Sequence, residues 1–378
     1  MHKWFSVSLL GLVATMTIGA LSLYAADTIK IGLTASLTGP AAEEGRYKVQ
    51  GAQLAAEEIN RAGGVLGKHV ELVIEDDQTT NPGIVTAFSK LAGDKDIVAF
   101  IGSVRSTQNM AMAPEVMRLG KPVMMGGTDP MLTHMGNPWF FRFRPNDRYS
   151  ARVMADFGLK TLGKKKWAIV HSTDTFGTGG MKALVEVLKG MGIEPVLVQG
   201  YTNNSQDFTP VALALKLSGA DVMASYFTFE PDLGIFAKQL NQLGIRIPWI
   251  GSAANISTTA LRLAGPALYD TYGVVDFNSD SCPSAKSFTA KYEAMYKVRP
   301  DHLSGWPYDA VHVLALAINN AKSLDPQKIR QAILAIKDYE GAEGTYNFDA
   351  NGDGLHGYNV VKNVKGYVEF NKRIEFKD

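Results

Sequence analysis

The stretch IVAFIGSVRST, residues 97–107, is the part of the sequence that decides the fold. The apolar run Ile97–Ile101 stops at Gly102, small polar residues follow with Arg105 among them, and a helix is expected to begin near Ser106. A strand that is apolar on both faces and leads through glycine into a helix is typical of a parallel sheet covered by helices. The stretch therefore predicts an α/β fold.

The same unit recurs along the chain in two sets. Strands are expected at 29–33, 70–74, 97–101 and 122–125 in the first set, and at 167–170, 196–198, 222–226 and 249–250 in the second. Segments with helical periodicity separate them. Each set predicts one α/β lobe with a parallel sheet, and the segment Phe140–Pro145 is expected to bridge the two lobes.

Composition and motifs argue against several classes of protein. The chain has 378 residues, 46% of them hydrophobic, which is enough for two domains with their own cores. Its 38 basic and 37 acidic residues are balanced, which is not the pattern of a nucleic-acid-binding protein. No nucleophile elbow, zinc-binding His-Glu-x-x-His or phosphate loop occurs, so we expect no catalytic site, metal or cofactor.

The first 26 residues have the form of a cleavable signal peptide. A short basic start precedes the apolar segment 5–23, and the small residues Ala25 and Ala26 offer a cleavage site before the polar chain. An uncleaved membrane anchor is the alternative interpretation. Cys282 is the only cysteine and lies far from the signal, so we expect neither a lipoprotein nor a disulfide. Export without disulfides favours a bacterial periplasm.

Two corners of the first lobe carry the residues expected to bind a ligand. Parallel sheets bind ligands beyond the carboxyl ends of their strands. There, Ser106 follows Gly102 at a helix start, and Thr128 follows Gly127 at the end of the next strand. Glycine allows close approach to the backbone, and free helix N–H groups attract an anion. These corners predict a site for a carboxylate, with Arg105 as a further candidate; the alternative is that Ser106 only caps its own helix.

Other notable stretches have simpler interpretations. Phe176–Gly180 begins like a dinucleotide loop, but Lys182 stands where the third glycine should be, so a helix-capping turn is favoured. The stretch 349–354 is half a calcium loop whose closing glutamate is replaced by Val360, so a β-turn is favoured. The aromatic residues at 226, 227 and 229 are expected either to wall a cleft or to pack in the core.

The ordered set of short motifs resembles the leucine/isoleucine/valine-binding protein family. Each motif is weak alone, but their order covers nearly the whole chain after the signal. The motifs include Leu37-Thr-Gly-Pro40, Glu58-Ile-Asn60, Asp76-Asp77, Gly102 with Ser106, Gly127-Thr128, Phe141-Arg142, Phe176-Gly177, Asp207-Phe208-Thr209 and Tyr308-Asp309-Ala310. Members of this family are periplasmic solute-binding proteins of ABC transporters with two hinged Rossmann-like lobes, the type I architecture.

The resemblance implies a domain organisation and a function. Residues 27–146 with 278–352 would form lobe 1, and residues 147–277 with 353–378 would form lobe 2, with the ligand cleft between them. The chain is then expected to be a monomer that binds a small amino acid of the branched-chain type, or a related carboxylate, and delivers it to an ABC permease. A ligand sensor on the same fold and an exported dinucleotide-dependent enzyme are the alternatives.

The resemblance also implies site residues. Ser106 and Thr128 match the family residues that hold the ligand's carboxylate, and Phe176 matches an aromatic residue that contacts the ligand. The strand-end aromatic of the second lobe corresponds to Thr228 or Phe229, and the loop after Pro40 brings in Glu44.

The sequence departs from the family at one position. Amino-acid binders of the family hold the ammonium group with an acid where this chain has Ala253. A buried unpaired ammonium is costly. Either Glu44, Asp174 or Glu230 replaces that acid, or the ligand is an aliphatic or aromatic carboxylate or an amide without an ammonium group.

Overall fold

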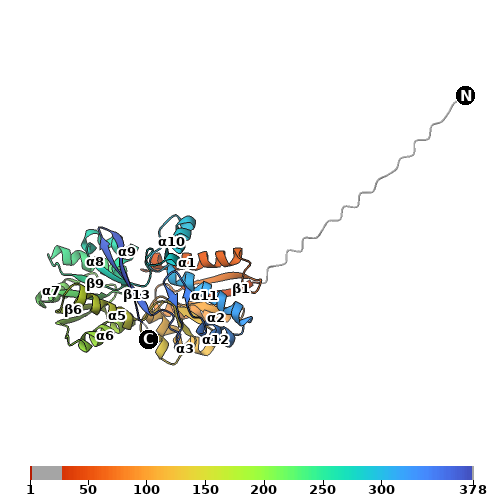
Figure 1. Cartoon of the computed structure of the whole chain (residues 1–378), viewed down its shortest axis with the longest axis horizontal. Helices are drawn as coiled ribbons and strands as arrows, with labels where there is room; N and C mark the ends of the chain where they lie inside the picture. The colour runs from red at the N-terminus through yellow and green to blue at the C-terminus, as the bar shows by residue number, and fades with distance from the viewer. Residues whose placement is uncertain (2–27, 377–378) are drawn as a thin grey trace.

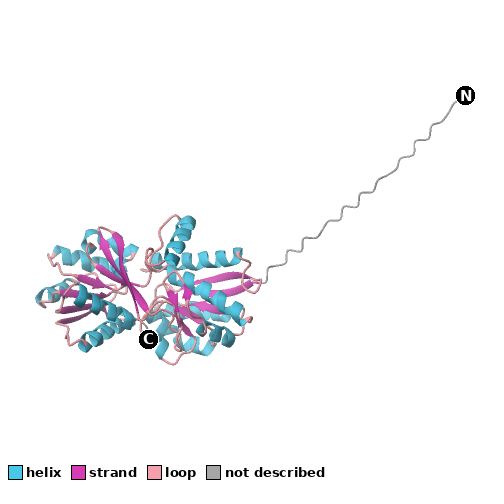
Figure 2. Ribbon diagram, viewed as in Figure 1, coloured by secondary structure: helices cyan, strands magenta, loops and turns pink. Residues whose placement is uncertain are grey.

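The computed structural model describes Met1 and residues 28–376 (Figure 1). The predicted signal peptide, apart from Met1, lies outside the described residues. Two lobes lie side by side, each with a sheet flanked by helices (Figure 2). Among the described residues, no helix combines the length and the apolar character needed to cross a membrane.

The first sheet is wholly parallel, with the strand order β2-β1-β3-β4-β5. Its strands are β1 (Thr28–Ala35), β2 (His69–Asp76), β3 (Ile97–Ile101), β4 (Val123–Met125) and β5 (Phe140–Arg142). The helices between them are α1 (Ala42–Arg61), α2 (Asn81–Gly93), α3 (Ser106–Leu119) and α4 (Met131–His134). The segment Phe140–Pro145, predicted to bridge the lobes, does lead from the first lobe to the second, but its first half is also a strand of the first sheet. Because Phe140 and Phe141 are both buried, this segment forms a fifth strand before it leaves the lobe.

The second sheet has the order β14-β13-β10-β9-β8-β6-β7. Its parallel strands are β6 (Trp167–Ser172), β7 (Leu197–Tyr201), β8 (Val222–Tyr226), β9 (Trp249–Gly251) and β10 (Tyr272–Val275). An antiparallel hairpin, β13 (Gly357–Val364) and β14 (Tyr367–Glu375), completes one edge. The helices are α5 (Asp147–Asp156), α6 (Thr175–Gly190), α7 (Thr209–Leu217), α8 (Glu230–Gln242) and α9 (Thr258–Ala264). The sequence analysis missed the short strand β10.

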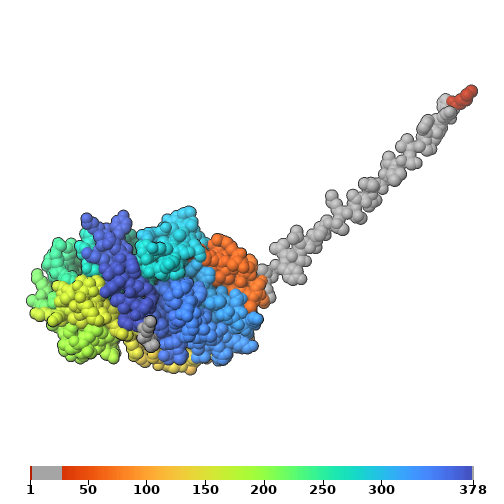
Figure 3. All heavy atoms as spheres, viewed as in Figure 1, coloured from red at the N-terminus to blue at the C-terminus, as the bar shows by residue number. Residues whose placement is uncertain are grey.

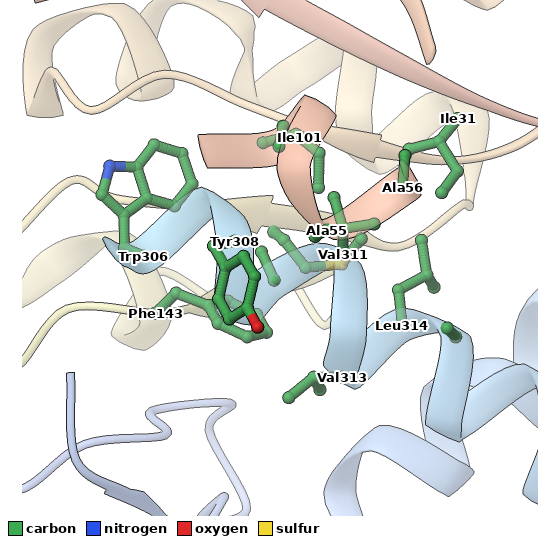
Figure 4. Packing of buried hydrophobic residues seen from close by; sticks show 14 of the residues in the cluster. Ile31, Ala55, Ala56, Ile101, Phe143, Trp306, Tyr308, Val311, Val313 and Leu314 are labelled. Carbon is green, nitrogen blue, oxygen red and sulfur yellow. The ribbon is translucent and has the colours of Figure 1, made fainter. Parts of the chain in front are cut away.

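The segment after β10 returns to the first lobe. It contains α10 (Pro283–Tyr296), α11 (Gly305–Ala321), α12 (Pro326–Leu334) and the small hairpin β11 (Tyr339–Glu340) and β12 (Thr345–Tyr346). Figure 4 shows Val311 and Leu314 of α11 packed near Ala55 and Ala56 of α1, and all of these belong to one buried core cluster. The last strands then run along the junction of the two lobes (Figure 3).

The chain therefore crosses between the lobes after β5, after β10 and after β12. Buried ion pairs tie these crossings together. Arg142 Nε lies 2.7 Å from Asp353 Oδ1, and Arg144 Nη2 lies 3.1 Å from Asp276 Oδ1. Burial alone would raise the pKa of Asp276, but the Arg144 guanidinium outweighs burial and holds this pKa below its ordinary value. Both pairs join segments that are distant in sequence, so they fix the geometry of the crossings.

Candidate ligand-binding site

A cavity lies between the lobes, beyond the carboxyl ends of the strands of both sheets. The predicted site residues that line it are Glu44, Arg105, Ser106, Thr128, Phe176, Thr228 and Ala253. Its lining also includes Asp147, Ser150, Glu230, Ser252, His302 and Tyr358. The cavity has a volume of about 60 Å³, which is room for several water molecules. The site therefore fits a small molecule.

Ser106 occupies the first helical position of α3 and does not cap its own helix. The N-cap residue is Arg105, whose side chain makes no cap hydrogen bond, and the first turn of α3 holds no acidic residue. Ser106 is buried, and its Oγ accepts a hydrogen bond of 3.1 Å from the backbone N–H of Asp129. The hydroxyl proton of Ser106 is thus available to a ligand, next to the partial positive charge of the helix end.

Thr128 is engaged with an acid that the sequence analysis did not identify. Its Oγ1 donates to Asp147 Oδ2 at 2.8 Å, and Ser150 Oγ donates to Asp147 Oδ1 at 3.1 Å. Burial raises the pKa of Asp147 to about 6, against the lowering effect of the Thr128 and Ser150 hydrogen bonds. While Asp147 is ionised, the Thr128 hydroxyl can accept a hydrogen bond from a ligand but cannot donate one.

Arg105 connects the two lobes at another wall of the cavity. Its Nη2 lies 2.6 Å from Glu44 Oε2 in the first lobe, and its Nη1 donates to the Thr228 carbonyl of the second lobe at 3.0 Å. The guanidinium lies over the Phe229 ring, 4.5 Å from its centroid. Burial, and then the neighbouring Glu44 carboxyl, raise the pKa of Glu230 well above its ordinary value. Glu44, Arg105 and Glu230 are below called the Arg105 cluster.

The Arg105 cluster leaves hydrogen-bonding capacity unused. In the part of the chain that the structure describes, Arg105 Nε and Ser252 Oγ are buried without a hydrogen-bond partner. Glu44 Oε1 and Glu230 Oε2 receive no hydrogen bond from another residue, and a hydrogen bond between these two carboxyls helps to raise the pKa of Glu230. All four side chains line the cavity. Each such atom carries a desolvation penalty of about 1–3 kcal/mol unless a partner is supplied. A bound ligand is the natural source of those partners.

The second lobe supplies an aromatic wall. Phe176 lines the cavity and packs edge-on against Tyr226, with ring centroids 5.9 Å apart. Phe227 also lines the cavity, whereas Tyr226 lies in the core of the lobe. The remaining predicted residues, Gly127 and Phe229, do not line the cavity but lie directly behind it: the Gly127 carbonyl accepts a hydrogen bond from Arg142, and Phe229 packs under Arg105.

The simpler interpretations of the glycine-rich stretches are confirmed. Asp174 caps α6 by accepting a hydrogen bond of 2.9 Å from the Gly177 N–H, so Phe176–Gly180 is the start of a capped helix. Asp349 closes a turn by accepting hydrogen bonds from the N–H groups of Asn351 and Asp353. Within residues 28–376, no group of three or more histidine, cysteine, aspartate and glutamate side chains is placed to hold a metal ion.

Glu44, Asp174 and Glu230 were considered as replacements for the acid that Ala253 lacks, and the structure places them in different surroundings. Asp174 is used in capping α6, and it does not line the cavity. Glu44 lines the cavity but is paired with Arg105. Glu230 lines the cavity and shares a hydrogen bond with Glu44, and Asp147 lies in the same cavity and receives only hydroxyl donors. Glu230 is one of the acids considered from the sequence, whereas Asp147, the first residue of α5, was not predicted.

Comparison with known proteins finds relatives along nearly the whole chain. The model of a family described as periplasmic binding protein matches residues 28–366. A leucine-, isoleucine-, valine-, threonine- and alanine-binding protein of Pseudomonas aeruginosa is 29% identical over 348 residues, covering 90% of this chain and 92% of its own. A Leu/Ile/Val-binding protein homolog of Brucella melitensis is 30% identical over 341 residues, covering 89% and 91%.

Solved structures show the same architecture. The leucine-binding protein LivK of Thermotoga maritima superposes with a TM-score of 0.85 at 26% identity, covering 92% of this chain and 99% of its own. A solute-binding protein of Rhodopseudomonas palustris, solved with benzoate, gives a TM-score of 0.83 at 21% identity, covering 93% and 98%, which shows the fold alone. The prediction of a two-lobed type I fold is confirmed.

Proposed function

The chain belongs to the periplasmic binding protein family, and from that premise we propose that it captures a small amino acid or related carboxylate between its lobes for an ABC importer. The observation that carries the proposal is a cavity between the lobes with an uncapped helix end at one wall and buried acids at others. Relatives named for leucine, isoleucine and valine support the amino-acid class.

The carboxylate of the ligand is assigned to the start of α3. Ser106 has a free hydroxyl proton, and the first turn of α3 contains no acid that would compete with an anion. Backbone N–H groups at a helix start bind carboxylates without a further positive charge. Val104 and Leu303 line the cavity beside this corner and exclude water from the bound group.

The ammonium group of the ligand is assigned to the acids of the second lobe. Asp147 lines the cavity and receives hydrogen bonds only from hydroxyl groups, and Thr128 Oγ1, expected from the sequence to hold the carboxylate, presents an acceptor beside it. Glu230 lines the same cavity beside Arg105. A buried ammonium needs such partners, and these groups compensate for the alanine at 253. An ammonium would also favour the ionised form of Asp147, whose pKa burial raises to about 6.

Transport by this chain follows from closure of the lobes around the ligand. The ligand contacts come from both lobes, so binding favours the closed arrangement, and a permease that selects that arrangement receives loaded protein. We place the protein in the periplasm, exported by cleavage of a signal within residues 1–26, without a lipid anchor and as a monomer. It acts by binding and release, with no catalytic step.

Thermal-shift screening tests the proposal. The chain is first stripped of copurifying solutes by partial unfolding and dialysis, and is then heated with amino acids, their deaminated analogues and amino-acid amides. A ligand at one hundred times its Kd stabilises the fold by about 2.7 kcal/mol, which raises Tm by several degrees. If amides without a carboxylate raise Tm as much as the parent acids, the assignment of the carboxylate to α3 is wrong.

A further inference from the structure

We propose that His302 limits the length of the ligand, because its imidazole separates the ligand cavity from a larger groove and blocks a chain that would extend past it. This inference rests on the proposed function, since it assumes that a small acid binds in the cavity with its carboxylate at Ser106. It makes His302 a residue that determines specificity.

A second, larger cavity adjoins His302. It has a volume of about 480 Å³, against about 60 Å³ for the ligand cavity, and is below called the outer groove. It lies between α9, the crossing after β10 and the turn that joins β13 to β14, from which Leu261, Phe277 and Tyr367 line it. Of the described residues that line the two cavities, His302 alone lines both. The imidazole is therefore the place where the two spaces meet.

The imidazole of His302 is held in place by an acid that joins the lobes. His302 Nδ1 lies 2.7 Å from Asp301 Oδ1. Asp301 Oδ2 accepts a hydrogen bond of 2.8 Å from the N–H of Thr258, the first residue of α9 in the second lobe. Burial alone would raise the pKa of Asp301, but the neighbouring His302 outweighs burial and lowers this pKa to about 2. Moving the ring aside would therefore break a buried pair.

The walls that remain once the polar groups of the ligand are placed suit an apolar chain. Ser106 takes the carboxylate and Asp147 the ammonium group, which leaves Ala253, Val274 and His302 to the chain. Beyond His302, the outer groove continues with the apolar residues Ile256, Leu261, Phe277 and Val368. A chain that ends before the imidazole is enclosed, whereas a longer one needs the space that the ring occupies.

Two substitutions distinguish a partition from a merely structural pair. His302→Ala removes the ring and joins the ligand cavity to the outer groove. His302→Phe also loses the pair with Asp301, but it keeps an aromatic ring at the junction. His134→Ala is the control, because His134 is exposed on α4 and lines neither cavity. The melting temperature without ligand reports the folding of all three variants.

Isothermal titration calorimetry with unbranched acids of increasing length tests the proposal. One series runs from 2-aminobutanoate to 2-aminodecanoate, and the other consists of the matching carboxylates without an ammonium group. In the parent, affinity should rise with chain length until the chain reaches His302, and then fall at least about tenfold. In His302→Ala the limit should move to chains longer by at least about two carbons, with each added methylene tightening binding about fourfold. His302→Phe and His134→Ala should keep the limit of the parent.

The outcomes separate this inference from the proposed function. If the parent binds the longest chains as tightly as the short ones, the inference is overturned without any variant. If His302→Ala keeps the limit of the parent, or if His302→Phe moves it as far as His302→Ala does, the inference is overturned and the proposed function stands. The same holds if another small acid binds but no member of either series does. If no small acid of any kind binds, both are overturned.

Discussion

Arg142 and Arg144, where the chain crosses between the lobes, are as deeply buried as Arg105, and Arg144 lines the same cavity as Arg105, but the hydrogen bonds of these arginines are distributed differently. Arg142 donates from all three nitrogens, to Asp353, to the backbone carbonyls at 127, 129 and 130, and to Thr133. Arg144 is likewise paired from all three nitrogens. Arg105 leaves Nε unpaired.

The difference distinguishes two uses of a buried charge. At the crossings the ion pairs are complete within the chain, so they fix geometry and need nothing from outside. At Arg105 the pairing is incomplete, although Arg144 lines the same cavity with all three nitrogens paired. Complete hydrogen bonding therefore marks the buried residues that hold the lobes together, and incomplete hydrogen bonding marks the residue expected to bind a ligand. Burial and charge do not distinguish the two. The following predictions test this distinction.

The largest effect is expected at the crossings. Arg144→Met should lower the free energy of unfolding by about 3–5 kcal/mol, because it leaves the Asp276 carboxylate buried without its partner. Chemical denaturation monitored by circular dichroism measures the change. Arg105→Met is the matched comparison, and it should cost less than half as much because Glu44 faces the cavity. Equal losses in the two variants would contradict the distinction.

The pH dependence of stability should have opposite signs at the two places. Burial raises the pKa of Asp147 from 3.8 to about 6, so this cavity acid stabilises the fold at low pH, and that contribution is lost as the pH rises from about 4 to about 6. The Arg144 guanidinium holds the pKa of Asp276 below its ordinary value despite burial. Asp276 therefore stabilises the fold at pH values above its ordinary pKa, and this stabilisation is lost as the pH falls through the lowered pKa.

Asp147→Asn isolates the cavity acid. The shift of Asp147 corresponds to about 3 kcal/mol, so the variant should gain that much unfolding free energy relative to the parent between pH 4 and pH 7. Other acids that titrate in this range cancel in the difference. Urea denaturation at a series of pH values measures it, and parallel stability curves would show that Asp147 has an ordinary pKa.

Ser106→Ala tests the carboxylate corner. Loss of the hydroxyl should weaken ligand binding by about 1–3 kcal/mol, or about fivefold to 150-fold in Kd, and should lower Tm without ligand because the Asp129 N–H loses its acceptor. Thr128→Val should also lower stability, because the Asp147 carboxylate loses a donor, and its loss of stability should grow as the pH rises and Asp147 ionises. Calorimetry and thermal melting of both variants separate the two roles. An unchanged Kd in Ser106→Ala would place the carboxylate elsewhere.

Much of the fold could be predicted because parallel strands bury both faces. The run Ile97–Ile101 is apolar throughout, Val222–Tyr226 is interrupted only by Ser225 and the Tyr226 hydroxyl, and each becomes a fully buried strand. Two short strands with weaker sequence signals were not predicted. Residues 272–275 form a strand only because β9 and β13 lie on either side, and Phe140–Arg142 pairs with β4 although its sequence also suits a linker.

The candidate site could be predicted only where local chemistry marks it. Ser106 and Thr128 follow glycines at strand ends, and that position points to a ligand. Asp147 and Ser150 carry no such mark, since an acid and a serine in the first turn of a helix are common whatever they face. Their place in the cavity depends on how the second lobe packs against the first, which no local pattern specifies.

The smallest effect is expected where the lobes touch beside the cavity. Gly179 lies in α6 of the second lobe, and a β-carbon there would be 2.3 Å from Asp129 Oδ2 of the first lobe. Gly179→Ala should therefore oppose closure by about 1 kcal/mol and weaken ligand binding about fivefold. Gly190→Ala, on the same helix with nothing within 4 Å of the added carbon, is the control. Thermal melting without ligand checks that both variants fold. Equal affinities would mean that the Asp129 side chain turns aside at no cost.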